Sequence, residues 1–223
     1  MLPIEGLPGW LHPVAKAAAT VTPAQLSRFL PPEDGGRTSA VLVLLGEGAA
    51  GPDLLLIQRA ADMRSHPGQP AFPGGAVDPG DTGPISAALR EAQEETGLDP
   101  SGVEVFATLP DLWLPPSGFV VTPVLGWWRT PSPVHAAEPA EVAAVHRVPV
   151  AELTDPGNRV LVTHPSGYVG PAFKVRGMLV WGFTAGLLDR LLAISGWEVP
   201  WDRDRTEPLP PSALGEPTSG SGR

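Results

Sequence analysis

The chain of 223 residues contains no cysteine. Disulfide bonds, thiolate metal sites and cysteine nucleophiles are therefore excluded, and the composition fits a reducing compartment. Basic residues are also scarce, because 15 Lys and Arg stand against 24 Asp and Glu and give a net charge of −9. That balance argues against a general nucleic-acid surface or an anionic-membrane surface, both of which favour basic patches.

Long apolar runs are absent as well. The longest, such as AVLVLL at 40–45, are far shorter than a membrane span. The first ten residues, MLPIEGLPGW, have neither the basic start nor the continuous apolar core of a signal peptide. We therefore expect a cytoplasmic protein without membrane or nucleic-acid partners, for which a homodimer is a possible assembly.

Glycine (26) and proline (29) are abundant and indicate long loops or tails. The chain is long enough for one domain with a sizeable core. We predict an N-terminal extension over 1–37 with a short helix at 22–30, and a main domain over 38–195. We expect the Pro/Gly/Ser-rich remainder, 196–223, to be a disordered tail.

Strand-like and helix-like segments alternate along the main domain. Continuous apolar character predicts buried strands at 39–46 and 53–59. Helices are predicted at 84–96, between Pro84 and Gly97, and at 177–194. Further strands are predicted at 103–109, 119–128, 141–148 and near 159–163. This interleaving predicts an α/β fold with layers around a mixed sheet.

The helix at 84–96 carries three carboxylates, Glu91, Glu94 and Glu95, on the face opposite its apolar side chains. Glu91 and Glu95 repel each other as i,i+4 neighbours, and the helix dipole disfavours acids near the C-terminal end. A solvated helix face is one explanation. A divalent cation explains the cluster better, since oxygen ligands on a rigid helix suit Mg²⁺ or Mn²⁺.

The segment that precedes this helix is a long loop, 60–83. Loops of this length in a compact chain are usually functional or disordered. The loop contains FPGG at 72–75, which supplies two glycines where the backbone must approach another group closely. A plain turn is the alternative, but a glycine pair followed by an acidic helix is a more specific arrangement.

Together these residues resemble the Nudix box: Gly, five residues, Glu, seven residues, then Arg-Glu-hydrophobic-x-Glu-Glu-x-Gly-hydrophobic. Here the box reads GAVDPGDTGPISAALREAQEETGL, over 75–98. The half from Arg90 to Leu98 matches closely, with Ala92 as a small hydrophobic residue. In the first half Asp81 replaces the usual Glu, and eight residues separate it from Arg90. A one-residue insertion before the helix accounts for this departure and leaves the role of Asp81 open.

A second pattern, LLIQRAADMRSHPGQPAFPGG at 55–75, resembles the signature that precedes the box in coenzyme A pyrophosphatases. The residues in register are Arg59, Ala60, Arg64, Gly68 and Phe72 to Gly75, while Ile57 replaces a threonine. The resemblance covers roughly 38–195. It implies a Nudix α/β/α sandwich with a mixed β-sheet. It also implies Mg²⁺- or Mn²⁺-dependent hydrolysis of coenzyme A to 4′-phosphopantetheine and adenosine 3′,5′-bisphosphate.

The resemblance also implies roles for individual residues. The expected metal ligands are Glu91 and Glu95, with Glu94 in the same shell and the carbonyl of Gly75 as a further donor. Arg90 is expected to hold the glutamates in position. The general base stays open between a box glutamate, Glu141 and Glu138.

The substrate-binding residues predicted from the signature are Arg59, Arg64, Gly68, Phe72, Gly74 and Gly75. Arginine forks suit phosphate oxygens, so Arg59 and Arg64 are expected to bind phosphates, with loop-anchoring salt bridges as the alternative. Two other functions remain open: hydrolysis of another nucleoside diphosphate derivative, such as ADP-ribose or a dinucleotide, and ligand binding without catalysis.

Overall fold

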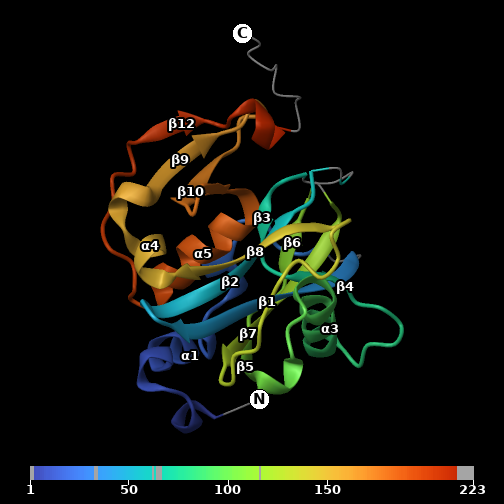
Figure 1. The fold of residues 1–223 in the computed structure, drawn as a ribbon. Coiled ribbons are helices and arrows are strands. Elements are labelled where there is room, and N and C mark those ends of the chain that lie inside the picture. The colour runs from blue at the N-terminus through green and yellow to red at the C-terminus, as the bar shows by residue number, and fades with distance from the viewer. Residues whose placement is uncertain (1–2, 33–34, 62, 64–66, 116, 215–223) are drawn as a thin grey trace.

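The computed structural model describes residues 3–32, 35–61, 63, 67–115 and 117–214. Arg64, one of the two arginines predicted to bind phosphate, lies outside these residues. A mixed eight-stranded sheet forms the centre of the molecule (Figure 1). Its central strands, β1 (Arg37–Gly48) and β7 (Phe119–Trp128), run parallel, and the other strand pairs of this sheet are antiparallel.

The remaining strands of the large sheet flank these two. The order is β3-β2-β1-β7-β5, with β4 paired to β1, β6 to β7 and β8 to β2. Their bounds are β2 (Gly51–Arg59), β3 (Pro70–Ala71), β4 (Gly74–Ala76), β5 (Val103–Thr108), β6 (Leu112–Leu114) and β8 (Val142–Pro149). The strands predicted from apolar runs are therefore confirmed, whereas the short β3, β4 and β6 were not predicted.

Helices cover both faces of the large sheet. On β1, Leu42 and Leu44 point to one face, whereas Val43 and Leu45 point to the other, and all four are buried. The first face is covered by α3 (Pro84–Thr96), which has the bounds predicted for it. The second is covered by α1 (His12–Ala18), α4 (Val150–Thr154) and α5 (Gly182–Ile194). The predicted α/β/α sandwich is confirmed. No helix within the described ranges is long and apolar enough to cross a bilayer.

A second, four-stranded sheet lies beside α5 (Figure 1). Its order is β11-β10-β9-β12, and its strands are β9 (Arg159–Thr163), β10 (Val169–Val175), β11 (Met178–Val180) and β12 (Thr206–Pro208). The helix predicted for 177–194 was therefore wrong at its start. Residues 178–180 pair with β10 as a hairpin, and the helix begins only at Gly182.

The two chain ends also differ from the prediction. Near the N-terminus, the predicted helix at 22–30 is shorter, α2 (Pro23–Leu26), and α1 was missed. The expected disorder of 196–223 is wrong for its described part, 196–214. There β12 pairs in parallel with β9, and Leu209 is buried against the outer face of the small sheet. Residues 215–223 are outside the described residues.

A buried cation, Arg159 on β9, ties the two ends of this C-terminal region together. Its side chain has no exposed surface and forms ion pairs with Asp189 on α5 and with Glu198, the latter at 3.4 Å. Its guanidinium also stacks on the rings of Phe173 and Trp201, with centroid distances of 4.9 and 4.5 Å. A buried charge is tolerated when it is paired and hydrogen-bonded, so Arg159 depends on partners contributed by later segments.

We predict that Arg159→Met lowers the free energy of unfolding by about 3–5 kcal/mol, because the buried Asp189 loses its closest partner and keeps only Arg203, at 3.7 Å. The control is Arg129→Met, which removes an exposed pair with Glu104 at 3.3 Å and should cost less than about 1 kcal/mol. Urea unfolding followed by circular dichroism measures both. Equal losses in the two variants would contradict a structural role for the buried pair.

Candidate active site

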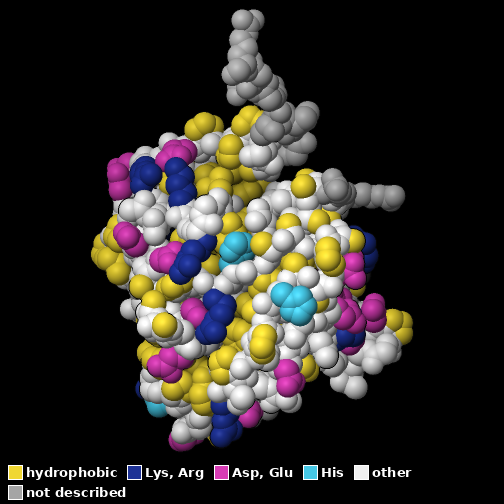
Figure 2. Space-filling view, viewed as in Figure 1, with side chains coloured by type: hydrophobic (Ala, Val, Ile, Leu, Met, Phe, Trp, Pro, Cys, Tyr) yellow, Lys and Arg dark blue, Asp and Glu magenta, His cyan; other side chains and the backbone are white. Residues whose placement is uncertain are grey.

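The helix α3 presents its carboxylates toward the glycine pair of β4. Pro84 occupies its first turn, and Gly97, with a φ of 67°, ends it in the left-handed conformation. Small buried side chains, Ala88 and Ala92, let the helix lie close to the sheet. Figure 2 shows acidic side chains gathered on this face of the molecule, over α3 and the loop before it.

Gly74 and Gly75 leave room for the approach of the backbone and the carboxylates. A Cβ atom at Gly74 would lie 2.3 Å from the carbonyl oxygen of Ala40, so β4 pairs with β1 only because this position has no side chain. A Cβ atom at Gly75 would lie 2.4 Å from the carboxylate of Glu91. The glycine pair therefore places the Glu91 carboxylate directly against the backbone, as the sequence predicted for a close approach.

Glu95 is the most buried of the three glutamates, with 3% of its surface exposed. Its Oε2 accepts a hydrogen bond from the backbone N–H of Gly74 at 2.9 Å. Burial raises the pKa of Glu95 to about 8, and the negative charges of Glu91 and Glu141 act in the same direction. Burial likewise raises the pKa of Glu91, against the opposing charge of Arg90. These carboxylates are held at a cost that a bound cation would remove.

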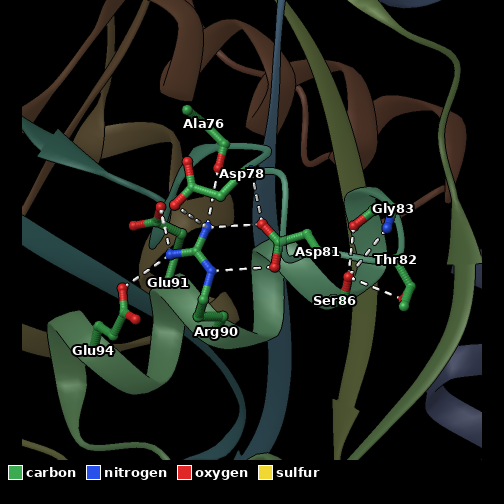
Figure 3. A network of polar contacts seen from close by, with 9 residues as sticks. All are labelled: Ala76, Asp78, Asp81, Thr82, Gly83, Ser86, Arg90, Glu91 and Glu94. Atoms are coloured by element: carbon green, nitrogen blue, oxygen red, sulfur yellow. Dashed lines mark hydrogen bonds and ion pairs between the residues drawn. The ribbon is translucent and has the colours of Figure 1, made fainter.

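Arg90 joins the acidic groups of the box in one network (Figure 3). Its Nη1 donates to Glu91 and to Glu94, each at 3.0 Å, and its Nη2 donates to the carbonyl of Ala76 at 3.1 Å. Asp81 accepts from Nε at 3.1 Å and from Nη2 at 2.9 Å. Arg90 thus positions Glu91 and Glu94 relative to the loop, which is the arrangement expected for it.

The bidentate pair gives Asp81 a role that the sequence left open. Its carboxylate lies 6% exposed, and the hydrogen bonds from Arg90 and from the N–H of Asp78 lower its pKa. The extra residue between Asp81 and Arg90 is accommodated before Pro84, where Gly83 adopts a φ of 150°. The spacing from Gly75 to Asp81 matches the family pattern, but the extra residue before Arg90 kept the sequence from predicting this contact.

Glu141 lies near the glutamates of α3, and the connection from β7 to β8 holds it there. The N–H groups of His135 and Ala137 donate to the carbonyls of Thr96 and Glu95, at 3.0 and 3.1 Å, so this connection is fixed to the C-terminal end of α3. The charge of Glu141 contributes to the raised pKa values of Glu91 and Glu95. Its side chain is exposed, as is that of Glu138.

Arg59, at the end of β2, reaches the same region. Its positive charge acts to lower the pKa of Glu95. Its Nε is buried, with no hydrogen-bond partner within the described ranges. Gly68, with a φ of 68°, donates its N–H to the carbonyl of Ala60 at 3.3 Å and turns the chain back toward β3.

Phe72 does not reach the site. It is 3% exposed and belongs to the hydrophobic core on the opposite face of the large sheet. Its predicted role as a substrate-binding residue is therefore not supported, since its ring is enclosed by apolar neighbours. Phe72 instead anchors the loop that carries Gly74 and Gly75.

The residues present fit a divalent cation in their chemistry. Among the described residues, no group of three or more His, Asp or Glu side chains is placed so that it could hold a metal ion. Two acidic side chains, Glu91 and Glu95, nevertheless meet at the backbone of Gly74 and Gly75, and both have raised pKa values. Mg²⁺ commonly uses one or two carboxylates and fills its other positions with water and substrate phosphate.

The fold is an α/β/α sandwich in which α3 presents carboxylates beside a glycine pair. Residues 36–166 match the NUDIX domain. The chain therefore belongs to the Nudix family, and it is a Nudix hydrolase whose substrate the match leaves unspecified.

Relatives and a solved structure agree with this assignment. The uncharacterized Nudix hydrolase NudL of Cronobacter sakazakii is 45% identical over 152 residues, which are 67% of this chain and 78% of the relative. NudL of Citrobacter koseri is 42% identical over 180 residues, 74% of this chain and 90% of the relative. The crystal structure of the Nudix hydrolase RenU from M. smegmatis has a TM-score of 0.53 and 21% identity, over 78% of this chain and 98% of that one, and supports the fold alone.

We predict that Glu95→Gln lowers kcat by about 10²-fold or more, as is typical when an electrostatic group is lost. The metal-free variant should keep its unfolding temperature, because a carboxyl with a pKa of about 8 is mostly protonated at pH 7 and resembles the amide. Mn²⁺ should raise the unfolding temperature of the parent but not of the variant. The control is Glu104→Gln, an exposed carboxylate on β5; near-normal turnover in Glu95→Gln would refute the assignment.

We predict that Asp81→Asn lowers activity about 10-fold, the effect of removing a group that orients a site residue. The amide cannot accept both hydrogen bonds from Arg90, so Glu91 and Glu94 lose a fixed neighbour. The control is Asp78→Asn, because Asp78 is 63% exposed and lies 3.6 Å from Arg90. Steady-state kinetics should separate the two variants, and identical activities would show that the bidentate pair is dispensable.

Proposed function

We propose that the chain is a divalent-metal-dependent hydrolase that cleaves the pyrophosphate of coenzyme A or a derivative. The products would be 4′-phosphopantetheine and adenosine 3′,5′-bisphosphate. One observation carries the proposal: the segment that resembles the coenzyme A signature adjoins the box glutamates. Arg59 ends β2 near Glu95, and Gly74 binds the Glu95 carboxylate. These contacts support a single site formed by the acidic helix and the segment that resembles the coenzyme A signature.

Each of the candidate site residues would have a defined role in this reaction. Bound Mg²⁺ or Mn²⁺ would neutralise phosphate charge and activate water. Glu91 and Glu95 would hold the ion, with Glu94 nearby and the Gly75 carbonyl as a further oxygen donor. Arg90 keeps the Glu91 and Glu94 carboxylates oriented, and it is itself held by Asp81 and the Ala76 carbonyl. A box glutamate or Glu141 would accept the proton of the attacking water. The charge of Glu141 acts to raise the pKa of Glu95, and this interaction with the site favours Glu141 as the base.

Arg59 supports coenzyme A as the substrate class. Its buried Nε is without a hydrogen-bond partner among the described residues, so an anionic group at this position would satisfy it. Coenzyme A carries an adenosine 3′-phosphate in addition to the pyrophosphate, and arginine forks bind phosphate oxygens well. Arg64 is proposed for the same role from the sequence signature.

Two alternatives define the outcomes of the test. Another nucleoside diphosphate derivative, such as ADP-ribose or a dinucleotide, would use the same glutamates with a different loop function. A silent ligand-binding module would keep the fold without turnover. Arg90 holds Glu91 and Glu94 in one network, and Gly74 holds the Glu95 carboxylate beside them, which favours catalysis over this second alternative.

The test is mass-resolved product analysis with coenzyme A, dephospho-coenzyme A, ADP-ribose and NADH, each with Mg²⁺, Mn²⁺ or EDTA. We expect metal-dependent release of the two proposed products, with coenzyme A favoured. Arg59→Ala should raise KM for coenzyme A about 10-fold, because a charged hydrogen bond to phosphate contributes about 1.5–3 kcal/mol.

If Arg59 binds the 3′-phosphate, Arg59→Ala should raise KM less for dephospho-coenzyme A than for coenzyme A. The control is Arg129→Ala, an exposed arginine that follows β7 and pairs with Glu104 on β5. Preferred cleavage of another substrate would overturn the coenzyme A assignment while leaving the glutamates in place. Ligand binding without any product would indicate the silent module.

A further inference from the structure

The segment 198–214, which we call the C-terminal strap, runs along the small sheet after α5 (Figure 1). It begins at the buried cation of β9. Glu198 accepts from Arg159 at 3.4 Å, from the indole of Trp201 at 3.1 Å and from Arg203 at 2.8 Å. Because Arg159 is fully buried and also paired with Asp189, the strap is fixed at its start.

The middle of the strap is part of the small sheet. The N–H of Leu161 donates to the carbonyl of Arg205 at 2.9 Å, and the N–H of Leu209 donates to the carbonyl of Thr163 at 3.0 Å. Leu209 is 5% exposed and packs on the outer face of the sheet. The strap thus has a fixed path up to the short helix that follows it, η5 (Pro211–Leu214).

The end of the strap contacts the segment that leads to the glycine pair. The side-chain Nε2 of Gln69 donates to the carbonyl oxygen of Ala213 at 3.4 Å, across 144 residues of sequence. Around this contact β11 and β3 also adjoin. Gln69 directly precedes β3, so η5 lies against the beginning of the strand that leads to Gly74.

Gln69 continues this connection to the proposed site. Its own carbonyl accepts the N–H of Arg59 at 3.1 Å, and the next residue, Ala60, donates its N–H to the carbonyl of Glu141 at 2.7 Å. The backbone of Arg59 and Ala60 is therefore held between Gln69 on one side and Glu141 on the other. A continuous set of contacts runs from Ala213 through Gln69 to Arg59, whose charge acts on Glu95.

We propose that the C-terminal strap is a positioning element of the substrate site, which acts through Gln69 on Arg59. The proposal rests on the proposed function for the identity of the substrate but not for the contact itself. Arg59 ends β2, where its N–H is bound by the Gln69 carbonyl on one side and its strand pairs with β8 on the other. The strap is fixed by the Arg159 pairs and by β12. Gln69 binds this rigid strap with its side chain and holds the Arg59 backbone with its carbonyl.

The experiment compares two ways of removing the contact. One variant is Gln69→Ala in the full chain, and the other ends the chain at Pro210, which removes η5 but keeps Leu209 and β12. Each should raise KM for coenzyme A about fivefold with kcat within about twofold, and the double variant should resemble either single variant. Combined with Arg59→Ala, neither change should raise KM further, because both act through Arg59.

The matched control is a chain ended at Leu214, which keeps η5 and should have the KM of the parent. Hydrogen exchange supplies a readout that needs no substrate: the Arg59 amide should exchange faster in Gln69→Ala and in the Pro210 chain, but not in the control. Additive KM effects, an unchanged KM or an unchanged Arg59 amide would overturn the proposal.

Failure of the coenzyme A assignment has a different signature. If the parent cleaves ADP-ribose or NADH in preference, the same variants are assayed on that substrate, and the strap is tested by the same KM criterion. If the parent cleaves nothing, the exchange rate of the Arg59 amide still decides whether the strap holds this backbone. A parent protein that does not prefer coenzyme A can therefore be distinguished from a variant that has lost the strap contact.

Discussion

The site depends on one constraint: several negative charges must be kept together beside a glycine backbone. Arg90 meets this constraint from within the same helix, because its guanidinium binds Asp81, Glu91, Glu94 and the Ala76 carbonyl at once. Five donors in a rigid fork make such multiple binding possible, whereas a lysine would offer one point charge. Glu95 is left outside this network and is instead held by Gly74. The arginine thus orders Asp81, Glu91 and Glu94, while the backbone orders the most buried acid, Glu95.

Much of this site could be predicted from the sequence, because its signals are local. The bounds of α3 followed from Pro84 and Gly97, and the shared face of its glutamates followed from helical periodicity. The glycine pair correctly indicated a close approach, and its partner proved to be Glu91. The spacing of the motif did not predict the partner of Asp81. One added residue shifts the sequence register relative to Arg90, but the loop before Pro84 accommodates that residue without separating the two side chains.

The small sheet and the C-terminal region were harder to predict, for a different physical reason. β11 has the apolar composition of the helix that follows it, so the pattern alone favoured one long helix over 177–194. The strap is rich in Pro and charged residues, which is typical of disorder. Its order comes from non-local contacts, chiefly the Arg159 pairs and the seat of Leu209 on the small sheet, and composition does not report these. The motif position of Phe72 says nothing about its burial in the apolar core.

The buried Arg159 also constrains how the protein is made. The residues that neutralise it, Asp189 and Glu198, lie 30 and 39 positions later in the chain. During synthesis β9 therefore leaves the ribosome well before its guanidinium can be paired, and the small sheet cannot close around an unpaired cation without a large penalty. A product that terminates before Glu198 would expose this region to proteases. The arginine thereby makes stable folding conditional on the segment through Glu198.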